Sequence, residues 1–275
     1  MFNFGKKQKG GPVQAVQSPV HRRRKLTYQA ANLQGIGSRD RQEDSFTIIN
    51  AFDVTEIMEK GLLFAVCDGM GGMKNGKLAS ETAVASLRNA FASMDRNQDM
   101  AGWLKESIYL AAGEVEKNLD GDGGSTIAAG IVYDEKLYYA SVGDSFLYLK
   151  RGSGLYRLNR EHNLRNQMYL ESIRLGTMNP QEGREASEAA ALTQFLGMKG
   201  FDDVDCSVRP LPLKEGDVLL ACSDGVGGVM DEDEIKNSLS LMSVQAMCGQ
   251  IEQKIAAHAK TNQDNYTALI VKCLY

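Results

Sequence analysis

The sequence predicts an α+β fold, in which strands and helices form separate layers. Apolar runs that are typical of strands occur in groups, near residues 45–50, 62–67, 125–133, 137–142, 146–150, 217–222 and 266–273. Helical patterns lie between these groups and occur in adjacent pairs. A parallel α/β sheet would alternate one strand with one helix, so the grouping favours segregated layers.

Helices are predicted where apolar residues recur with helical spacing. Five segments have this pattern: 80–94, 103–119, 164–175, 231–240 and 243–259. The first two carry long apolar stripes that should face the core, whereas the third pattern is weaker. Acidic residues open the fourth segment, and Ser243 is a suitable cap for the fifth. Residues 176–191 are polar and acidic, and we expect them to form a surface excursion.

Length and composition indicate one catalytic domain. With 275 residues, of which 43% are hydrophobic, the chain can bury a single large core. No apolar stretch approaches the roughly 20 residues that span a bilayer, and the N-terminus lacks an apolar signal core, so we expect a cytoplasmic enzyme. Three of the five cysteines, Cys67, Cys222 and Cys273, lie in strand-like runs, as expected of core residues in a reducing compartment. Three separated histidines argue against a histidine-rich zinc site.

The N-terminal segment differs in charge from the rest of the chain. Residues 1–38 contain seven Lys or Arg and no acid, which leaves 24 basic and 35 acidic residues, a net charge of −11, in the remainder. Glycine, proline and weak periodicity predict that residues 1–25 are a flexible basic tail before a catalytic domain at 26–275. Such a tail either contacts an acidic surface or is a solvated leader. We expect no nucleic-acid partner.

Two distant segments nearly repeat each other. Residues 67–72 read CDGMGG and residues 223–228 read SDGVGG, and each follows an apolar run. An aspartate at the mouth of a buried strand, with glycines that let the chain turn away, directs its carboxylate into the adjoining cleft. An isolated Asp-Gly pair is usually only a turn. The repetition favours a functional interpretation.

Further carboxylates occupy similar places at strand ends. Asp144 follows the run at 138–142, Asp264 precedes the run at 267–271, and Glu43-Asp44 directly precedes 45–49. Two carboxylates about 4 Å apart repel by roughly 4 kcal/mol at an effective dielectric constant of 20. Divalent cations remove that cost, and oxygen ligands favour Mg²⁺ or Mn²⁺. Arg39, four residues before Glu43, suits the phosphate of a substrate.

Two phosphate-binding motifs compete with this interpretation. Residues 71–77 fit the first seven places of a P-loop, but the eighth is Leu78, which has no hydroxyl for Mg²⁺. A P-loop would predict nucleotide binding that depends on Lys77. Gly35-Ile36-Gly37 lacks the third glycine of a dinucleotide fingerprint, because Asp40 stands there. Residues 123–126 are better explained as a turn that enters a strand.

The motifs, taken in order, resemble those of the metal-dependent (type 2C) serine/threonine protein phosphatases of bacteria. The resemblance covers about residues 30–273 and rests on Arg39-x-x-x-Glu43-Asp44, Asp68-Gly69-Met70-Gly71-Gly72, Gly124-Ser125-Thr126, Val142-Gly143-Asp144-Ser145, Ser223-Asp224-Gly225 and Asp264-Asn265. It implies a central antiparallel β-sandwich flanked on both sides by helix pairs. It also implies a variable flap, which influences substrate choice, at about residues 163–200.

The resemblance further implies roles for individual residues. Two core Mg²⁺ or Mn²⁺ ions would be ligated by Asp68, Asp224, Asp264 and the carbonyl of Gly69. Glu43 and Asp44 would act through bound water, and Asp144 with Asp224 would form a third, weaker site. Arg39 would hold the substrate phosphate, so that Arg39, Asp68 and Asp224 would carry the catalysis.

By the same resemblance, the chain hydrolyses phosphoserine and phosphothreonine in proteins by direct attack of a metal-bridged hydroxide, without a covalent phosphoenzyme. Its partners would be phosphorylated proteins and a cognate Ser/Thr kinase. The alternative is a catalytically silent regulator of the same fold that only binds phosphoproteins, although the complete set of aspartates argues against it. The chain has Met70 where many eukaryotic members have a histidine, and Phe146 where an arginine often stands. For His162 a structural role is expected.

Overall fold

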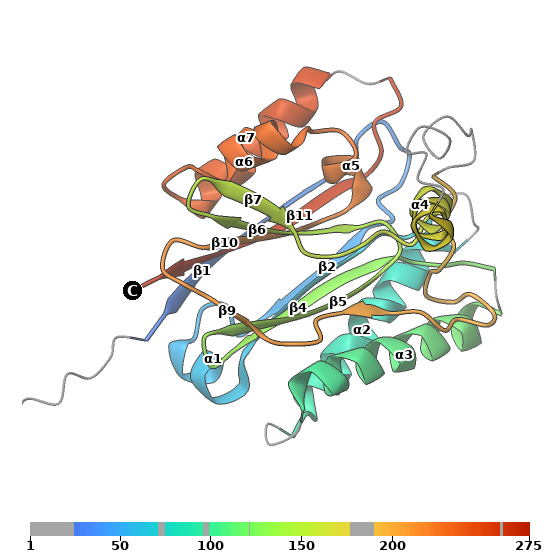
Figure 1. Cartoon of the computed structure of the whole chain (residues 1–275), viewed down its shortest axis with the longest axis horizontal. Helices are drawn as coiled ribbons and strands as arrows, with labels where there is room; N and C mark the ends of the chain where they lie inside the picture. Colours follow the sequence, from blue (N-terminus) through green and yellow to red (C-terminus); the bar gives the residue numbers. More distant parts are fainter. Residues whose placement is uncertain (1–24, 71–74, 96–98, 121, 177–189, 259–260) are drawn as a thin grey trace, which may run out of the picture.

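The computed structural model describes residues 25–70, 75–95, 99–120, 122–176, 190–258 and 261–275. Two β-sheets lie face to face, and helices cover the outer face of each sheet (Figure 1). Every strand pair in both sheets is antiparallel. The expected α+β architecture, an antiparallel sandwich flanked by helix pairs, is confirmed.

The first sheet has the strand order β1-β11-β10-β6-β7. Its strands are β1 (Thr27–Gly35), β6 (Phe146–Arg151), β7 (Gly154–Arg157), β10 (Val218–Cys222) and β11 (Tyr266–Leu274). The second sheet has the order β2-β3-β4-β5-β8, and β9 also pairs with β5. Its strands are β2 (Ser45–Ile49), β3 (Leu62–Cys67), β4 (Ile127–Tyr133), β5 (Lys136–Val142), β8 (Asp205–Cys206) and β9 (Leu211–Pro212).

The helices lie in pairs outside the two sheets. On the second sheet pack α2 (Gly76–Ala92) and α3 (Met100–Leu119), and on the first sheet α6 (Glu232–Ser238) and α7 (Val244–His258) (Figure 1). Three further helices are α1 (Val54–Lys60), α4 (Leu164–Leu175) and α5 (Asp224–Gly227). Helix α4, the weakest helical pattern, has no buried residue. The predicted tail, up to residue 24, and most of the predicted excursion, residues 177–189, lie outside the described residues. Among the described helices, none combines the length and apolar character needed to cross a membrane.

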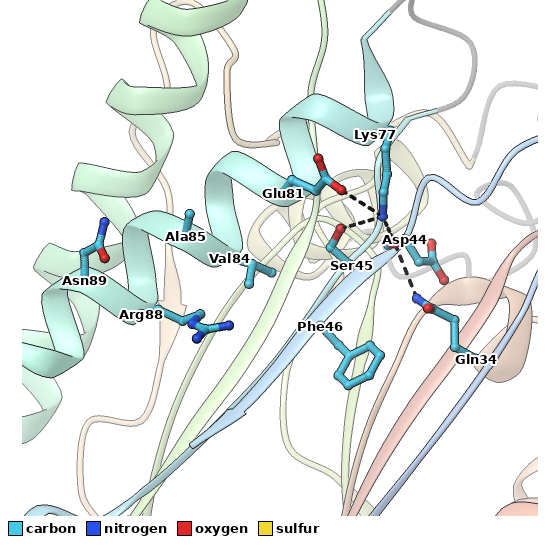
Figure 2. A pocket seen from close by; sticks show the side chains of 10 residues that line it. All are labelled: Gln34, Asp44, Ser45, Phe46, Lys77, Glu81, Val84, Ala85, Arg88 and Asn89. Carbon is cyan, nitrogen blue, oxygen red and sulfur yellow. Dashed lines mark hydrogen bonds and ion pairs between the residues drawn. The ribbon is translucent and has the colours of Figure 1, made fainter. Parts of the chain in front are cut away.

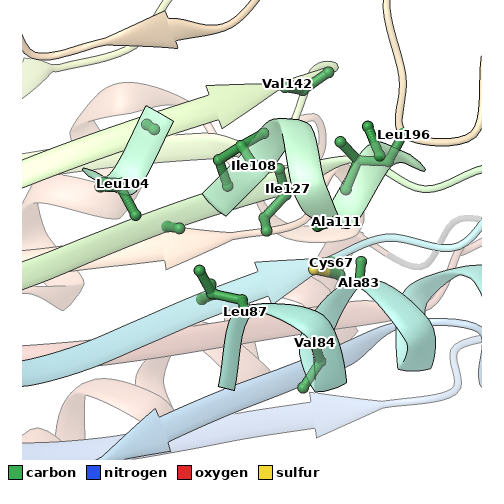
Figure 3. Close-up of a cluster of buried hydrophobic side chains, with 14 of the residues drawn as sticks. Cys67, Ala83, Val84, Leu87, Leu104, Ile108, Ala111, Ile127, Val142 and Leu196 are labelled. Carbon is green, nitrogen blue, oxygen red and sulfur yellow. The ribbon is translucent and has the colours of Figure 1, made fainter. Parts of the chain in front are cut away.

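The apolar runs of the central strands reflect burial on both faces. In β3, alternate residues pack between the sheets (Leu62, Phe64 and Val66) and against the helices (Leu63, Ala65 and Cys67). Such a strand has no solvent-facing position, so its sequence is continuously apolar. The helix layer closes with side chains such as Leu87, Leu104 and Ile108, which meet over β3 and β4 (Figure 3). Fully burying each such side chain contributes about 1.5–3 kcal/mol.

The three cysteines in the strand-like runs are core residues, as expected. All five thiols are free, and Cys67, Cys222 and Cys273 are fully buried in the apolar clusters.

The structure contains strand β1, which the sequence pattern did not predict. Only Ala30 and Leu33 are buried in its nine residues, and its Gln and Asn residues disfavour strands. The strand exists because it pairs with β11 over its whole length, from Thr27 opposite Leu274 to Gly35 opposite Tyr266. A local sequence pattern cannot report such a long-range partner.

Candidate active site

Strand register brings the predicted site residues to one end of the sandwich, the end remote from the C-terminus (Figure 1). In the second sheet Ser45 lies opposite Cys67, so Asp44 and Asp68 leave the sheet side by side. In the first sheet Cys222 lies opposite both Phe146 and Ala268. The segments that carry Asp144, Asp224 and Asp264 therefore start from neighbouring strand ends.

We call five carboxylates at this end the acidic cluster: Asp44, Asp68, Asp144, Asp224 and Asp264. The pKa of Asp68 is raised well above its usual value by burial, and next by the charges of Asp44 and Asp224. Burial raises the pKa of Asp44 to about 6. Burial, with the charge of Asp224, raises the pKa of Asp144 to about 7. The pKa of Asp224 is also raised, by burial and then by Asp264. Each member thus lies within electrostatic range of another.

Asp44 is anchored through one oxygen only. Its Oδ2 accepts hydrogen bonds from Ser223 Oγ at 2.9 Å and from Thr267 Oγ1 at 2.7 Å. Among the described residues, its Oδ1 is buried without a hydrogen-bond partner, and so is Oδ1 of Asp224. A buried polar atom without a partner costs about 1–3 kcal/mol, and more when it is charged. A cation bound directly or through water would relieve that cost.

The donor set therefore fits divalent cations with oxygen preference. Within the described ranges, no three His, Cys, Asp or Glu side chains are arranged to ligate an ion as they stand. Mutual repulsion between ionised carboxylates opposes their closer approach in the metal-free fold, and a bound cation would offset that repulsion.

The backbone of Asp68 is held by the Ser125-Thr126 segment. Its carbonyl accepts hydrogen bonds from the amide of Thr126 at 2.9 Å and from Ser125 Oγ at 3.0 Å. Its own amide donates to Thr126 Oγ1 at 3.1 Å, and that hydroxyl pairs with Ser145 Oγ at 2.7 Å. Local pattern assigned residues 123–126 to a turn, and the family resemblance included Gly124-Ser125-Thr126 without giving this segment a supporting role.

Gly69 lies where two other chain segments approach it closely. A Cβ atom at this position would meet the Gly76 carbonyl oxygen at 2.2 Å and the Glu43 carbonyl oxygen at 2.6 Å. Only glycine allows this approach, which keeps Asp68 beside the segment that carries Glu43.

Asn265 fixes the segment that carries Glu43. Its side chain donates to the carbonyls of Ile36 at 2.8 Å and Arg41 at 2.9 Å, and it accepts from the amide of Glu43 at 2.7 Å. The carbonyl of Glu43 accepts a hydrogen bond from Ser80 Oγ. The positioning role of Asn265 could not be foreseen, because its partners lie more than 200 residues away in sequence.

Arg39 lies beside the acidic cluster, as the spacing to Glu43 suggested. Its Nη2 is 2.6 Å from Asp264 Oδ2, and both side chains are about half exposed, at 49% and 40%. The guanidinium is thus at the solvent-facing side of the cluster, and its charge is paired with Asp264 in this arrangement.

His162 supports the loop that carries Asp144. Its amide donates to the carbonyl of Gly143 at 2.8 Å, a glycine with φ of +91°. The ring is buried, neither nitrogen has a hydrogen-bond partner in the part of the chain that the structure describes, and Nε2 lies 3.6 Å from Asp203. Burial lowers the pKa of the His162 imidazole. The structural role expected for His162 remains a prediction.

Known proteins are similar to this chain in sequence and in fold. A family model described as "Protein phosphatase 2C" matches residues 31–179, more than half of the chain. The chain belongs to the protein phosphatase 2C family. A serine/threonine phosphatase named stp, from Listeria monocytogenes, is 30% identical over 216 residues, which cover 75% of this chain and 82% of that protein. The expected family and enzyme class are confirmed.

Solved structures of bacterial phosphatases have the same fold as this 2C family member. Stp1 from Staphylococcus aureus superposes with a TM-score of 0.75, at 22% identity, over 90% of this chain and 95% of its own. The catalytic domain of PstP, which was solved in complex with two manganese ions, gives a TM-score of 0.72 at 20% identity, over 91% and 100% of the two chains.

Lys77 is not oriented as a P-loop lysine in this 2C family member. Its ammonium donates to the Asp44 carbonyl at 2.9 Å and to Ser45 Oγ at 3.1 Å, and it lies 3.5 Å from Glu81 (Figure 2). These contacts tie the first turn of α2 to the start of β2. Residues 71–74 of the alternative motif lie outside the described residues.

The raised pKa values predict how pH affects the metal-free 2C domain. Asp144, with a folded pKa of about 7 against about 3.9 unfolded, destabilises the fold increasingly as pH rises through that window. Asp144→Asn should therefore raise Tm in EDTA by about 2–4 °C at pH 7.5, and by less at pH 5, where the folded carboxyl is protonated. Thermal unfolding of both proteins at the two pH values measures the difference, in which contributions such as that of His162 cancel. A gain in Tm that is independent of pH would contradict the prediction.

Proposed function

We propose that this chain is a Mg²⁺- or Mn²⁺-dependent protein phosphatase that hydrolyses phosphoserine and phosphothreonine directly, without a covalent intermediate. One observation carries the proposal: five carboxylates converge at one end of the sandwich, and two of their buried oxygens have no hydrogen-bond partner within the described ranges. Structural turns have no need of carboxylates that lie close together, whereas a divalent metal centre needs them as ligands.

The proposed metal ligands agree with the hydrogen bonds that hold their segments in place. Asp68, Asp224, Asp264 and the carbonyl of Gly69 would hold two core ions, and Asp144 with Asp224 a third. Asp44, with one oxygen held by Ser223 and Thr267, and Glu43 would contribute through water. When bound, paired divalent cations activate water and offset charge on the phosphate.

Arg39 would bind the phosphate of the substrate. A guanidinium forms paired hydrogen bonds with phosphate oxygens, and Arg39 lies half-exposed at the side of the cluster where a phosphate would enter. Its present partner, Asp264, is also a proposed ligand of the core ions, so Arg39 lies beside the site that those ions would occupy.

In the cell, the chain would oppose a Ser/Thr kinase on cytoplasmic phosphoproteins. A catalytically silent regulator is the second candidate, favoured only if the cluster binds metal without turnover. Each aspartate of the acidic cluster lies within electrostatic range of another, which favours the enzyme.

Hydrolysis of p-nitrophenyl phosphate tests the proposal directly. The purified chain should release p-nitrophenol in the presence of Mn²⁺, and EDTA should abolish the release, because the acidic cluster cannot act without its ions. Calorimetry with Mn²⁺ alone provides the control for binding. Binding without turnover would favour the regulator, and turnover in EDTA would contradict metal dependence.

A further inference from the structure

A groove runs away from the acidic cluster between α2 and the edge strands β1 and β2. It encloses a volume of about 540 Å³. Strand β2 ends the second sheet and β1 ends the first, so the groove lies along one open edge of the sandwich. Figure 2 shows the lining side chains of α2 in order along the helix, from Lys77 at one end to Asn89 at the other, with those of the β1 and β2 segments facing them.

One end of the groove lies against the segment that carries Asp44 of the candidate active site. Asp44, a member of the acidic cluster, lines one end, next to Ser45 and Lys77. Phe46, Val84 and Ala85 line the stretch beyond it. A peptide whose phosphorylated residue entered the cluster could therefore continue along this lining.

The charges of the groove are balanced near the cluster and unbalanced at the far end. Lys77 is engaged by Asp44, Ser45 and Glu81. Arg88 is exposed, and within the described part of the chain its side chain makes no hydrogen bond or ion pair. Its guanidinium extends from α2 into the groove (Figure 2). An acidic group of a bound ligand would therefore complement the charge of Arg88 at the far end of the groove.

Helix geometry sets the distance between the two ends. Lys77 and Arg88 are eleven residues apart on α2, which corresponds to about 16 Å at 1.5 Å per residue. An extended peptide advances about 3.3 Å per residue, so the same distance takes about five residues. Lys77 contacts the Asp44 carbonyl, so for a phosphate bound near that end of the groove the preferred acid would be about five residues away and not immediately beside the phosphate.

We propose that this groove binds the extended segment flanking the phosphorylated residue of a protein substrate, and that Arg88 pairs with an acidic residue about five positions away. The inference rests on the proposed function and adds a sequence preference to it. Arg88 is a specificity residue: it touches the substrate remote from the reacting phosphate.

Synthetic phosphoserine peptides with Mn²⁺ test the inference. Four peptides would carry Glu or Gln five residues before or after the phosphoserine, and p-nitrophenyl phosphate would serve as the substrate without a flank. With the native chain, kcat/KM should be about fivefold higher for the Glu peptide than for its Gln partner on at least one side, as expected for one partly exposed ion pair. Arg88→Ala should remove that preference and leave hydrolysis of p-nitrophenyl phosphate unchanged.

The matched control is Arg209→Ala, which removes an exposed arginine between β8 and β9 at the opposite edge of the same sheet. It should retain the preference for Glu. Equal kcat/KM for Glu and Gln peptides with the native chain would overturn the proposed role of the groove. An equal loss of the Glu preference in both arginine variants would also overturn it. Failure of the proposed function would instead appear as absent turnover of p-nitrophenyl phosphate.

Discussion

An Asp224→Asn variant should hydrolyse p-nitrophenyl phosphate at least about a hundredfold more slowly than the native chain, while its fold stays intact. Loss of a partner that merely orients a metal ligand already costs about 10–100-fold, and Asp224 is proposed as a ligand itself. The amide has the shape of the carboxylate but not its charge. Because Asp224 lies in electrostatic contact with Asp68, Asp144 and Asp264, loss of its charge should weaken the binding of every proposed ion.

The same variant should be more stable than the native chain when no metal is present. Burial and Asp264 raise the pKa of Asp224, so its ionised form is unfavourable in the metal-free fold. In EDTA at pH 7.5 the Tm should rise, whereas added Mn²⁺ should raise it less than it does for the native chain. Calorimetric titration with Mn²⁺ gives the affinity independently of turnover.

Asp233→Asn is the matched control. It makes the same chemical change at an exposed aspartate in the first turn of α6, outside the acidic cluster. Its turnover and Mn²⁺ affinity should equal those of the native chain. Near-full activity in Asp224→Asn would refute the proposed ligand role, and a destabilised metal-free variant would refute the electrostatic account of the cluster.

The layers and the acidic ends of strands could be predicted because both depend on local pattern. Strand β3 is apolar at every position since each of its faces is covered, and Asp68 follows it directly. The aspartate after β10 shows the same relation. A carboxylate that repeatedly follows a fully buried strand is improbable unless something at that end binds it, so the pattern carried functional information.

The supports of the site could not be predicted, because they depend on partners remote in sequence. Thr126 holds Asp68 across 58 residues, and Asn265 holds Glu43 across 222. The local sequence around a threonine or an asparagine does not reveal whether that residue caps a turn or holds a distant loop. The pairing of Arg39 with Asp264, 225 residues apart, was likewise hidden, although the position of Arg39 beside the cluster was foreseen from four-residue spacing alone.

Replacing Gly69 by alanine should impair activity and stability together. The added Cβ would meet two backbone carbonyl oxygens, those of Gly76 and Glu43, at 2.2 and 2.6 Å, and neither is the end of a flexible side chain. Relief requires the α2 start or the Glu43 segment to move away from Asp68. Overpacking of this kind costs about 1–3 kcal/mol. A shift of about 1 Å in positioned groups can cost about a hundredfold in rate.

The control for Gly69→Ala is the same substitution in the middle of α3. A Cβ at Gly113 would have nothing within 4 Å, so Gly113→Ala should stabilise the chain by about 0.5–1 kcal/mol through helix propensity and leave turnover unchanged. Denaturant unfolding and Mn²⁺-dependent hydrolysis separate the two variants. If Gly69→Ala matched Gly113→Ala in both measurements, the close approach that joins Asp68 to the Glu43 segment would not be what holds the site together.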